Sequence, residues 1–454
     1  MIQFSGYDDV ITRIYEHKQD QVFKYWDDLS KQNKKRLLDE LKDVDLSLME
    51  KLHADSGKQH ENLQFGPPIL IPIPKTDEQK EKRAIAISKG SKFIKKGHIA
   101  AFVVAGGQAS RLGYNGPKGI FPIAPVSGKS LFQLHGEKIL ASSRKYGAEI
   151  PWLIMTSIYN HDETLTYFKK MDFFGLDERN IFVFHQNMIP SLDMNGKLVL
   201  ETPWSLFKNP DGHGGSFGAM NSSGALMKIK ERGVKIISYF QVDNPLVKII
   251  DPEFIGYHIL SAAEASGKAV PKAYPEEKVG IFVKFSSGNT GVVEYSDLPP
   301  EKTTAYTKDG SLLYSAANIA VHLFNLDFIE RLTSDENPPL PFHTANKKLS
   351  AYDGETDGLK FEKFIFDVFP MAERTVVMET RREEEFAPVK NASGPDSPET
   401  SQKLMNELHR KWLVSRGIDI PEKVSVIEIS PLTALEAEDI PTGIAIPDAA
   451  EIEL

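Results

Sequence analysis

The sequence predicts an α/β protein built on a mixed, mainly parallel sheet. Short apolar runs alternate with helical segments from residue 98 onward, and such alternation is typical of βαβ units with parallel strands. Two later runs, at 280–285 and 290–295, lie so close together in the chain that they predict an antiparallel pair. The chain has 454 residues, of which 41% are hydrophobic and 26% charged. This composition is that of a globular protein with a sizeable core.

The N-terminal part predicts a small helical unit over residues 7–54. Its apolar residues recur at helical spacing, and they include Val22, Phe23, Trp26, Leu37, Leu38 and Leu41. The proline-rich stretch 66–74 forbids helix and predicts an extended linker. Residues Thr76 to Gln79 have the pattern of a capping box, which predicts a helix that continues to Ser88.

The central part predicts the strands of the sheet at 98–104, 152–156, 180–185 and 234–243, with a helix from Ser130 to Tyr146. In sheets of this type, ligands bind at the carboxyl ends of the strands. After Lys390 a turn-rich stretch leads to a helix over 402–414. We therefore expect three consecutive domains: a helical domain with its linker at 1–90, a catalytic domain at 91–389 and a small C-terminal domain at 390–454.

Composition excludes several classes of function. The chain carries 54 Lys and Arg against 63 Asp and Glu, a net charge of -9, which argues against nucleic acid as the main partner. It has no cysteine, which excludes disulfides, thiolate metal sites and a cysteine nucleophile. The first residues have no basic or apolar leader pattern, and no apolar run approaches the roughly 20 residues that span a bilayer. We expect a cytoplasmic protein without a membrane partner.

The stretch 105–113 is the most informative feature. It follows the predicted strand 98–104 and runs into 117–119. Its glycines let backbone N–H groups approach a ligand, and Arg111 and Lys118 would neutralise phosphate oxygens, so the loop predicts a nucleoside triphosphate site. A dinucleotide fingerprint does not fit, because Gly106 and Gly107 are adjacent. The stretch 127–130 resembles the end of a P-loop, but the required first glycine is absent from position 123.

Two further clusters each have a functional and a purely structural interpretation. The glycine-dense stretch 210–215 suits close backbone approach to a flat ligand, or it is a surface turn. Its occurrence in the same chain as the first loop favours the ligand. Asp243, before Asn244 and Pro245, ends an apolar strand. A carboxylate there is well placed to hold Mg²⁺ against phosphates, although Asp and Asn before Pro also start turns. The strongly apolar strand favours magnesium.

Three positions remain open on the residues alone. Glu294 is either an acceptor for ligand hydroxyls or an exposed strand glutamate. Alternation over 360–367 predicts a strand with Phe364 and Phe366 on one face, either as a ligand wall or as a core stripe. Lys390 either reaches a phosphate or is solvated.

The motifs taken together resemble a known family. They stand at 105–113, 117–119, 210–215, 242–244, 292–296, 317–320, 362–367 and 388–391. In this order they closely resemble the UDP-N-acetylglucosamine pyrophosphorylases of the UDP-sugar pyrophosphorylase family, and the resemblance covers nearly the whole chain. It implies a Rossmann-like, GT-A-like nucleotidyltransferase sheet between an N-terminal helical domain and a small C-terminal domain.

The resemblance also implies a role for each matching residue. Gly106 and Gly107 would face the nucleotide, and Gln186 and Gly212 would recognise uracil. Arg111 and Lys118 would hold the UTP phosphates, and Lys390 would grip the sugar-1-phosphate. Asp243 would bind Mg²⁺, with Asp367 as a second candidate ligand. The remaining predicted substrate contacts are Pro210, His213, Asn244, Gly280, Glu294, Asn318, Phe364 and Phe366; Gly280, Glu294 and Asn318 would line the sugar pocket, and the two phenylalanines would face the N-acetyl group.

The implied reaction joins UTP and N-acetylglucosamine-1-phosphate into UDP-N-acetylglucosamine and pyrophosphate, by in-line attack on the α-phosphorus. Two alternatives stand beside it: the same reaction with glucose- or galactose-1-phosphate, and a nucleotide-sugar sensor without catalysis. There are three departures from the family pattern, of which those at His213 and Ala317 bear on the choice of sugar and the one at Ala109 and Ser110 is mild. His213 replaces the usual Asn, Ala317 replaces Gly, and Ala109 with Ser110 replaces Gly-Thr.

Overall fold

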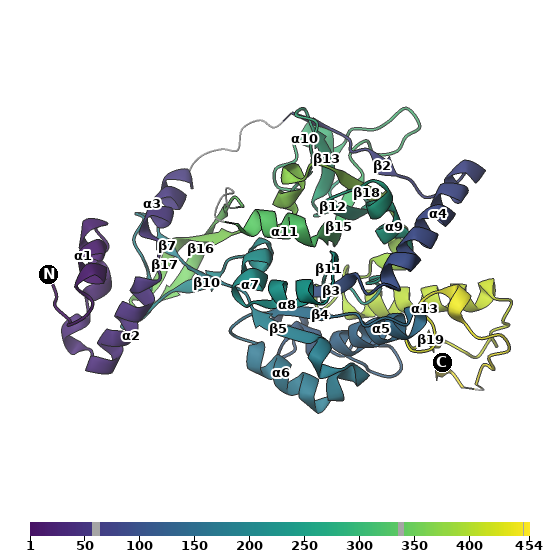
Figure 1. Cartoon of the computed structure of the whole chain (residues 1–454), viewed down its shortest axis with the longest axis horizontal. Helices are drawn as coiled ribbons and strands as arrows, with labels where there is room; N and C mark the ends of the chain where they lie inside the picture. Colours follow the sequence, from purple (N-terminus) through teal and green to yellow (C-terminus); the bar gives the residue numbers. More distant parts are fainter. Residues whose placement is uncertain (57–63, 335–339, 448) are drawn as a thin grey trace. The chain divides into compact units, whose positions relative to one another are not determined.

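The computed structural model describes residues 1–56, 64–334, 340–447 and 449–454 (Figure 1). The chain forms two compact units that are interleaved along the sequence. Unit 1 comprises 1–63, 186–216 and 340–365, and unit 2 comprises 64–185, 217–339 and 366–454, each where described. The three consecutive domains expected above stay a prediction.

The helices of unit 1 are α1 (Asp8–Glu16), α2 (Lys31–Lys42) and α3 (Leu46–Asp55). Side chains cap two of them: Ser30 accepts from the N–H of Asn33, and Asp45 accepts from that of Leu48. The apolar residues predicted from helical spacing are all buried in one core. The predicted helical unit is therefore confirmed.

Short strands complete the core of unit 1. They are β6 (Met188–Pro190), β7 (Leu192–Asp193), β8 (Leu200–Thr202), β9 (Ser205–Leu206), β10 (Lys208–Pro210), β16 (His343–Ala351) and β17 (Gly354–Glu362). Strand β17 pairs with both β16 and β7, and all these pairs are antiparallel. Leu192, Leu359 and Phe361 pack into the same core as the N-terminal helices. Unit 1 thus takes its core from three segments that lie far apart in the sequence.

Unit 2 is built on an eleven-stranded mixed sheet. Its strands are β1 (Phe65–Gly66), β2 (Leu70–Ile71), β3 (Ile99–Val104), β4 (Trp152–Thr156), β5 (Ile181–His185), β11 (Ile236–Gln241), β12 (Ala265–Pro271), β13 (Ile281–Phe285), β14 (Thr290–Val293), β15 (Ala316–Asn325) and β18 (Thr375–Glu379). The main order is β2-β18-β12-β15-β11-β3-β4-β5. Strands β11, β3, β4 and β5 run parallel to one another, whereas β15 is antiparallel to both β11 and β12. The mixed, mainly parallel sheet and the antiparallel β13–β14 pair were both predicted.

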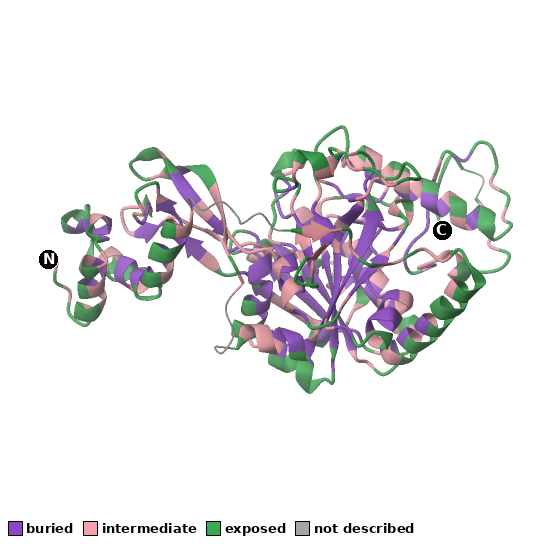
Figure 2. Ribbon diagram, turned by 90° about the horizontal axis from the view of Figure 1, so that it is seen from above, coloured by how far each residue is buried: buried purple, intermediate pink, exposed green. Residues whose placement is uncertain are grey.

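The longer helices of unit 2 are α4 (Asp77–Ile94), α5 (Leu131–Tyr146), α6 (His161–Lys170), α8 (Ala225–Glu231), α9 (Pro252–Leu260), α11 (Leu326–Thr333) and α13 (Pro398–Ser415). The shorter ones are α10 (Pro300–Thr303) and α12 (Arg382–Glu385), and α7 (Ser216–Ser222) begins at the last residue of a unit 1 segment. The capping box at Thr76 and Gln79 is confirmed, but the helix extends past Ser88 to Ile94. Strands of the large sheet are mostly buried in Figure 2.

Helices α4 and α9 lie side by side (Figure 1) and approach through two glycines. A Cβ on Gly90 would lie 1.9 Å from the carbonyl oxygen of Pro252, and one on Gly256 would lie 1.8 Å from that of Ala86. Both distances are far below van der Waals contact. The two backbones therefore touch, and only glycine fits at either position.

The predicted linker is correct in being extended, but it also joins the sheet. Strand β1 pairs with β13, and β2 pairs with β18. The prolines at 67, 68, 72 and 74 stand outside these two-residue strands, where no ladder N–H is required. After α13, strands β19 (Val426–Glu428) and β20 (Glu451–Glu453) pair in parallel over a separate apolar cluster. Within the described residues, no helix is both long and apolar enough to span a bilayer.

Candidate active site

The loop after β3 folds back on itself. The N–H of Ala109 donates to the carbonyl of Gly116 (3.0 Å), and the N–H of Lys118 donates to that of Gly107 (3.0 Å). The turn between them closes at Gly113, whose φ of 70° favours glycine. Ala109 has a φ of -91°, so the methyl group of this residue causes no backbone strain. Gly107 and Arg111 lie on the exposed side, and a Cβ on Gly107 would meet open space.

A buried asparagine forms hydrogen bonds to two backbone carbonyls of this loop. Asn160, which is 1% exposed, donates from Nδ2 to the carbonyls of Ala105 (3.0 Å) and Gly107 (3.4 Å). Its Oδ1 accepts from the backbone N–H of Ser157 (2.8 Å) and from the Ser157 hydroxyl (3.1 Å). Asn160 was not among the predicted site residues, because an asparagine before a helix is typical of an N-cap.

Two predicted site residues meet at the carboxyl ends of adjacent strands. Strands β3 and β11 are parallel neighbours in which Val104 pairs with Gln241, so both chains leave the sheet at one edge. Lys118 Nζ lies 2.9 Å from Asp243 Oδ2, with 16% and 13% of the two side chains exposed. The structure thus brings the predicted phosphate-binding cation and the predicted metal ligand into direct contact, at the edge where ligands bind.

The segment that leads to Lys390 is bonded to the same turn. Asn244 donates from Nδ2 to the carbonyl of Glu385 (2.7 Å), and its Oδ1 accepts from the N–H of Ala387 (3.1 Å). The N–H of Val389 donates to the carbonyl of Asp243 (2.9 Å). The Glu385 carboxylate is fixed in turn by an ion pair with the fully buried Lys268. The Asn244 side chain therefore positions residues 387–390, while its predicted substrate contact stays a prediction.

Lys390 itself is half exposed, and it directly follows Val389, whose N–H bonds to the carbonyl of Asp243. Its backbone N–H donates to the carbonyl of Asp396 (2.6 Å), and its Nζ lies 3.5 Å from Asp396 Oδ2. An exposed pair at this distance is weak. The ammonium can therefore exchange Asp396 for a phosphate at little energetic cost.

The three residues predicted to line the sugar pocket also lie together. The N–H of Asn318 donates to the carbonyl of Gly280 (2.8 Å), and a Cβ on Gly280 would lie 2.8 Å from Glu294 Oε1. Ala317, which replaces the family's glycine, is fully buried between β12 and β13, opposite Val270 and Ile281. Its methyl group is therefore part of the sheet core next to Asn318.

In unit 1, the glycine-dense stretch 210–215 packs against the chain that follows β17. Gly212 has a φ of 82°, and a Cβ on it would lie 2.4 Å from the carbonyl oxygen of Lys363. The N–H of Gly214 donates to that same carbonyl (2.8 Å), and the N–H of Lys363 donates to the carbonyl of Asp211 (2.8 Å). The stretch is therefore not a free surface turn, and close packing on residues 363–364 explains its glycines.

One prediction about residues 360–367 is wrong. Strand β17 ends at Glu362, so Phe364 and Phe366 do not share a strand face: Phe366 lies in the 3₁₀ segment Ile365–Met371. The Phe364 ring stacks between the rings of His213 (5.4 Å) and His343 (4.3 Å). His213 Nδ1 accepts from the N–H of Ile365 (3.1 Å), and this bond, together with the packing of Gly214 on residue 364, ends the strand.

The imidazole of His213 is a neutral acceptor. Burial lowers its pKa to about 4, and the neighbouring Glu362 opposes that shift only in part. Because Nδ1 accepts a hydrogen bond from the backbone, the ring proton is on Nε2. At neutral pH the ring therefore offers one N–H donor and no charge.

Burial of the Asp211 carboxyl, within the stretch 210–215, destabilises the folded chain in a way that can be tested. It is 6% exposed, and burial raises the pKa of its carboxyl from 3.8 to about 6. The unfolded chain loses this proton near pH 4 and the folded chain near pH 6, so stability falls as pH rises through that window. Asp211→Asn should raise the free energy of unfolding by about 3 kcal/mol at pH 7.5 and by almost nothing near pH 4. Urea unfolding at both pH values measures this, and an equal gain at both would contradict it.

The remaining predicted residues lie as follows. Gln186 is buried, Pro210 pairs with Met188 in β10 and β6, Gly106 is half-buried and Asp367 lies half-buried in the 3₁₀ segment. In the described part of the chain, no three His, Asp or Glu side chains converge as a metal-binding group. The P-loop-like stretch 127–130 is structural, because Glu428 accepts from the N–H of Ser127 and Lys129 pairs with Glu137 (3.1 Å) and Glu453 (2.9 Å).

Comparison with known proteins agrees with this geometry. A family model described as UTP–glucose-1-phosphate uridylyltransferase matches residues 31–438. UDP-N-acetylglucosamine diphosphorylase 2 of Arabidopsis thaliana is 36% identical, over 96% of this chain and 91% of the relative. UDP-N-acetylglucosamine pyrophosphorylase of Saccharomyces cerevisiae is 33% identical, over 94% of each chain. The solved structure of the uridine diphosphate N-acetylglucosamine pyrophosphorylase of Trypanosoma brucei, in complex with an inhibitor, has a TM-score of 0.85 at 28% identity, over 97% of this chain and 95% of that one.

Proposed function

The chain belongs to the UTP–glucose-1-phosphate uridylyltransferase family, and from that premise we propose that it joins UTP and N-acetylglucosamine-1-phosphate into UDP-N-acetylglucosamine and pyrophosphate. Relatives named for UDP-N-acetylglucosamine support the choice of sugar. In this proposal the partners of the chain are its two substrates, and it binds neither nucleic acid nor a membrane. A chain without cysteine fits a reducing compartment such as the cytoplasm.

One observation carries the proposal: the Lys118–Asp243 pair lies at the sheet edge between the glycine loop and the segment that bears Lys390. A non-catalytic sensor needs the glycines but not this arrangement of charges. Transfer of a nucleotidyl group does need it, because negative charge increases on the leaving pyrophosphate and must be neutralised by fixed cations.

The mechanism is in-line attack by an oxygen of the sugar-1-phosphate on the α-phosphorus of UTP. A new P–O bond forms on one side, and the bond to pyrophosphate breaks on the other. The attacking oxygen is already anionic, so no general base is required. The protein's residues therefore act by positioning and by charge: Lys118 and Arg111 on the UTP phosphates, and Lys390 on the sugar phosphate.

The residues fit a magnesium ion. Mg²⁺ prefers oxygen ligands and is usually bound by one or two carboxylates together with substrate phosphates. Asp243 offers such a carboxylate, of which Oδ2 faces Lys118, and Asp367 is the second candidate. When bound, the ion would neutralise phosphate charge beside Asp243. The lack of a three-carboxylate or histidine cluster in the described residues agrees with an ion that arrives with the nucleotide.

The experiment is a pyrophosphate-release assay with UTP and each of three sugar phosphates: N-acetylglucosamine-1-phosphate, glucose-1-phosphate and galactose-1-phosphate. We expect kcat/KM to be highest for the first, and turnover to be lost when EDTA removes Mg²⁺. A higher kcat/KM for glucose-1-phosphate would overturn the choice of sugar. No pyrophosphate under any condition would favour the sensor instead.

A further inference from the structure

We propose that Asn160 is a positioning residue for UTP, which fixes the backbone of the glycine loop so that two N–H groups face the nucleotide. This inference rests on the proposed function and deepens it. The fixed atoms are the carbonyl oxygens of Ala105 and Gly107, both bonded by the Asn160 carboxamide.

The hydrogen bonds settle how the carboxamide is oriented. The two loop carbonyls are acceptors only, so Nδ2 must face them, and the backbone N–H of Ser157 is a donor only, so Oδ1 must face it. The bonds to Ala105 and Ser157 are buried, and the bond to Gly107 is partly buried. A buried amide with every group paired is rigid, because breaking any one bond leaves an unsatisfied polar group.

The helix that follows does not use this side chain. Asn160 is the N-cap of α6, a place where asparagine usually accepts from an N–H of the first turn. Here the side chain makes no such bond. Its polar groups bond instead to the loop after β3 and to Ser157, so stabilising α6 does not explain their orientation.

Peptide geometry connects these bonds to the ligand. In a planar trans peptide, the C=O and the next N–H point in opposite directions. With the carbonyls of Ala105 and Gly107 held toward Asn160, the N–H groups of Gly106 and Gln108 point to the other side. Among the residues that the structure describes, neither N–H has a hydrogen-bond acceptor. Backbone N–H groups left exposed on one side of a glycine loop can bind anions.

The same bonds extend to the charged pair. The carbonyl of Gly107 accepts from Asn160 and also from the backbone N–H of Lys118. Lys118 in turn pairs with Asp243. The asparagine therefore supports both the N–H groups and the cation predicted to meet the phosphates.

The test compares three variants of the full chain. Asn160→Ala removes every bond. Asn160→Asp keeps the shape and the acceptor for Ser157 but turns an oxygen toward the two carbonyls. Asn160→Ser keeps a residue type that caps helices but cannot reach the loop. We expect all three to lower kcat/KM for UTP by about 10- to 100-fold, with the KM for the sugar phosphate within about 3-fold of wild type. The serine variant should be the most stable of them.

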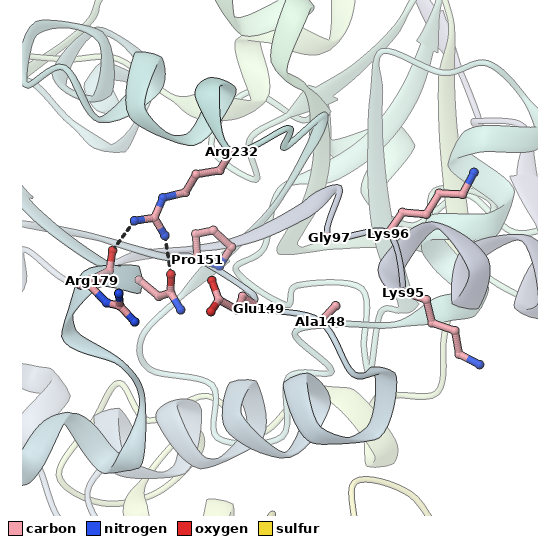
Figure 3. Close-up of a pocket in the computed structure, with 9 residues that line it drawn as sticks. Lys95, Lys96, Gly97, Ala148, Glu149, Pro151, Arg179 and Arg232 are labelled. Atoms are coloured by element: carbon pink, nitrogen blue, oxygen red, sulfur yellow. Dashed lines mark hydrogen bonds between the residues drawn. The ribbon is translucent and has the colours of Figure 1, made fainter.

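Asn180→Ala is the matched control. Asn180 is 9% exposed, its Oδ1 accepts from Arg232, and it precedes β5 at the opposite, amino end of the strands. It helps to line a pocket with Lys95, Lys96 and Arg232, and these three residues are labelled in Figure 3. The Asn180→Ala substitution therefore removes one buried carboxamide, as Asn160→Ala does, but at a place away from the predicted nucleotide site. We expect a comparable loss of thermal stability with kcat/KM for UTP within about 2-fold of wild type.

The outcomes separate this inference from the proposed function. Two results would overturn the role of Asn160. One is a decrease in kcat/KM for UTP no larger than that of Asn180→Ala, and the other is an equal decrease in kcat/KM for UTP and for the sugar phosphate. If the wild type makes no UDP-sugar, the proposed function fails, and calorimetric titration with UTP alone still tests Asn160: weaker binding by the three variants than by the control supports it. A wild-type chain that binds no UTP overturns both.

Discussion

Replacing Lys118 with alanine is expected to lower kcat by about 100- to 1,000-fold, the usual loss when one preorganised electrostatic group is removed from a transition state. The substitution removes the cation predicted to face the phosphates and leaves the Asp243 carboxylate, 13% exposed, without its partner. Steady-state turnover of UTP and N-acetylglucosamine-1-phosphate measures the effect. Near-normal turnover would contradict the assignment.

Lys129→Ala is the control for this prediction. The Lys129 side chain is also 16% exposed, and it pairs with Glu137 and Glu453 rather than with a site residue. Lys118→Ala breaks one partly buried ion pair and Lys129→Ala breaks two, so Lys129→Ala should lower Tm at least as much. Only Lys118→Ala should lose turnover, and a matching loss in Lys129→Ala would mean that the effect is general destabilisation.

Gly256→Ala is expected to give the largest loss of stability. Its Cβ would lie 1.8 Å from the carbonyl oxygen of Ala86, so α4 and α9 would have to separate. Overpacking between two backbones has no flexible side chain to absorb it, and we expect a loss above about 4 kcal/mol and a Tm lower by about 5–10 °C. Scanning calorimetry at one heating rate measures this.

Gly66→Ala provides the comparison, because a Cβ there meets nothing within 4 Å and the backbone of Gly66 is not left-handed. It should change Tm by no more than about 1–2 °C. Equal shifts in the two variants would show that the helices move apart without cost.

Local patterns predicted the parallel half of the sheet in unit 2, but not strands β12, β15 and β18. Apolar runs identified β3, β4, β5 and β11 to within about two residues. For β3, β4 and β11 the reason is that parallel strands buried on both faces read as continuous hydrophobic segments. The capping box at Thr76 placed the start of α4. The rule that ligands bind at the carboxyl ends of parallel strands placed the glycine loop and Asp243 in the site, but the Lys118–Asp243 contact itself was not predicted.

The errors came from contacts that depend on distant residues. Alternation over 360–367 predicts a strand to its end, but bonds from residues 211–214 to residues 363–365 stop it after Glu362. Strands β1 and β2 form only because β13 and β18 offer free edges. Asn160 was missed for the same reason, since its type and place predict a cap, and only the folded loop shows what it bonds.

The three-segment core of unit 1 has a consequence for synthesis on the ribosome. The N-terminal helices bury Leu37 and Trp26 in a core that also needs Leu359 and Phe361, and translation proceeds from the N-terminus at about 5–20 residues per second. These apolar side chains therefore lack part of their core for roughly 15 to 60 seconds, until the β16–β17 hairpin has left the exit tunnel. During that interval they form a surface that chaperones can bind. The N-terminal part of unit 1 is therefore synthesised first, but its core is completed only after strand β17 has been translated.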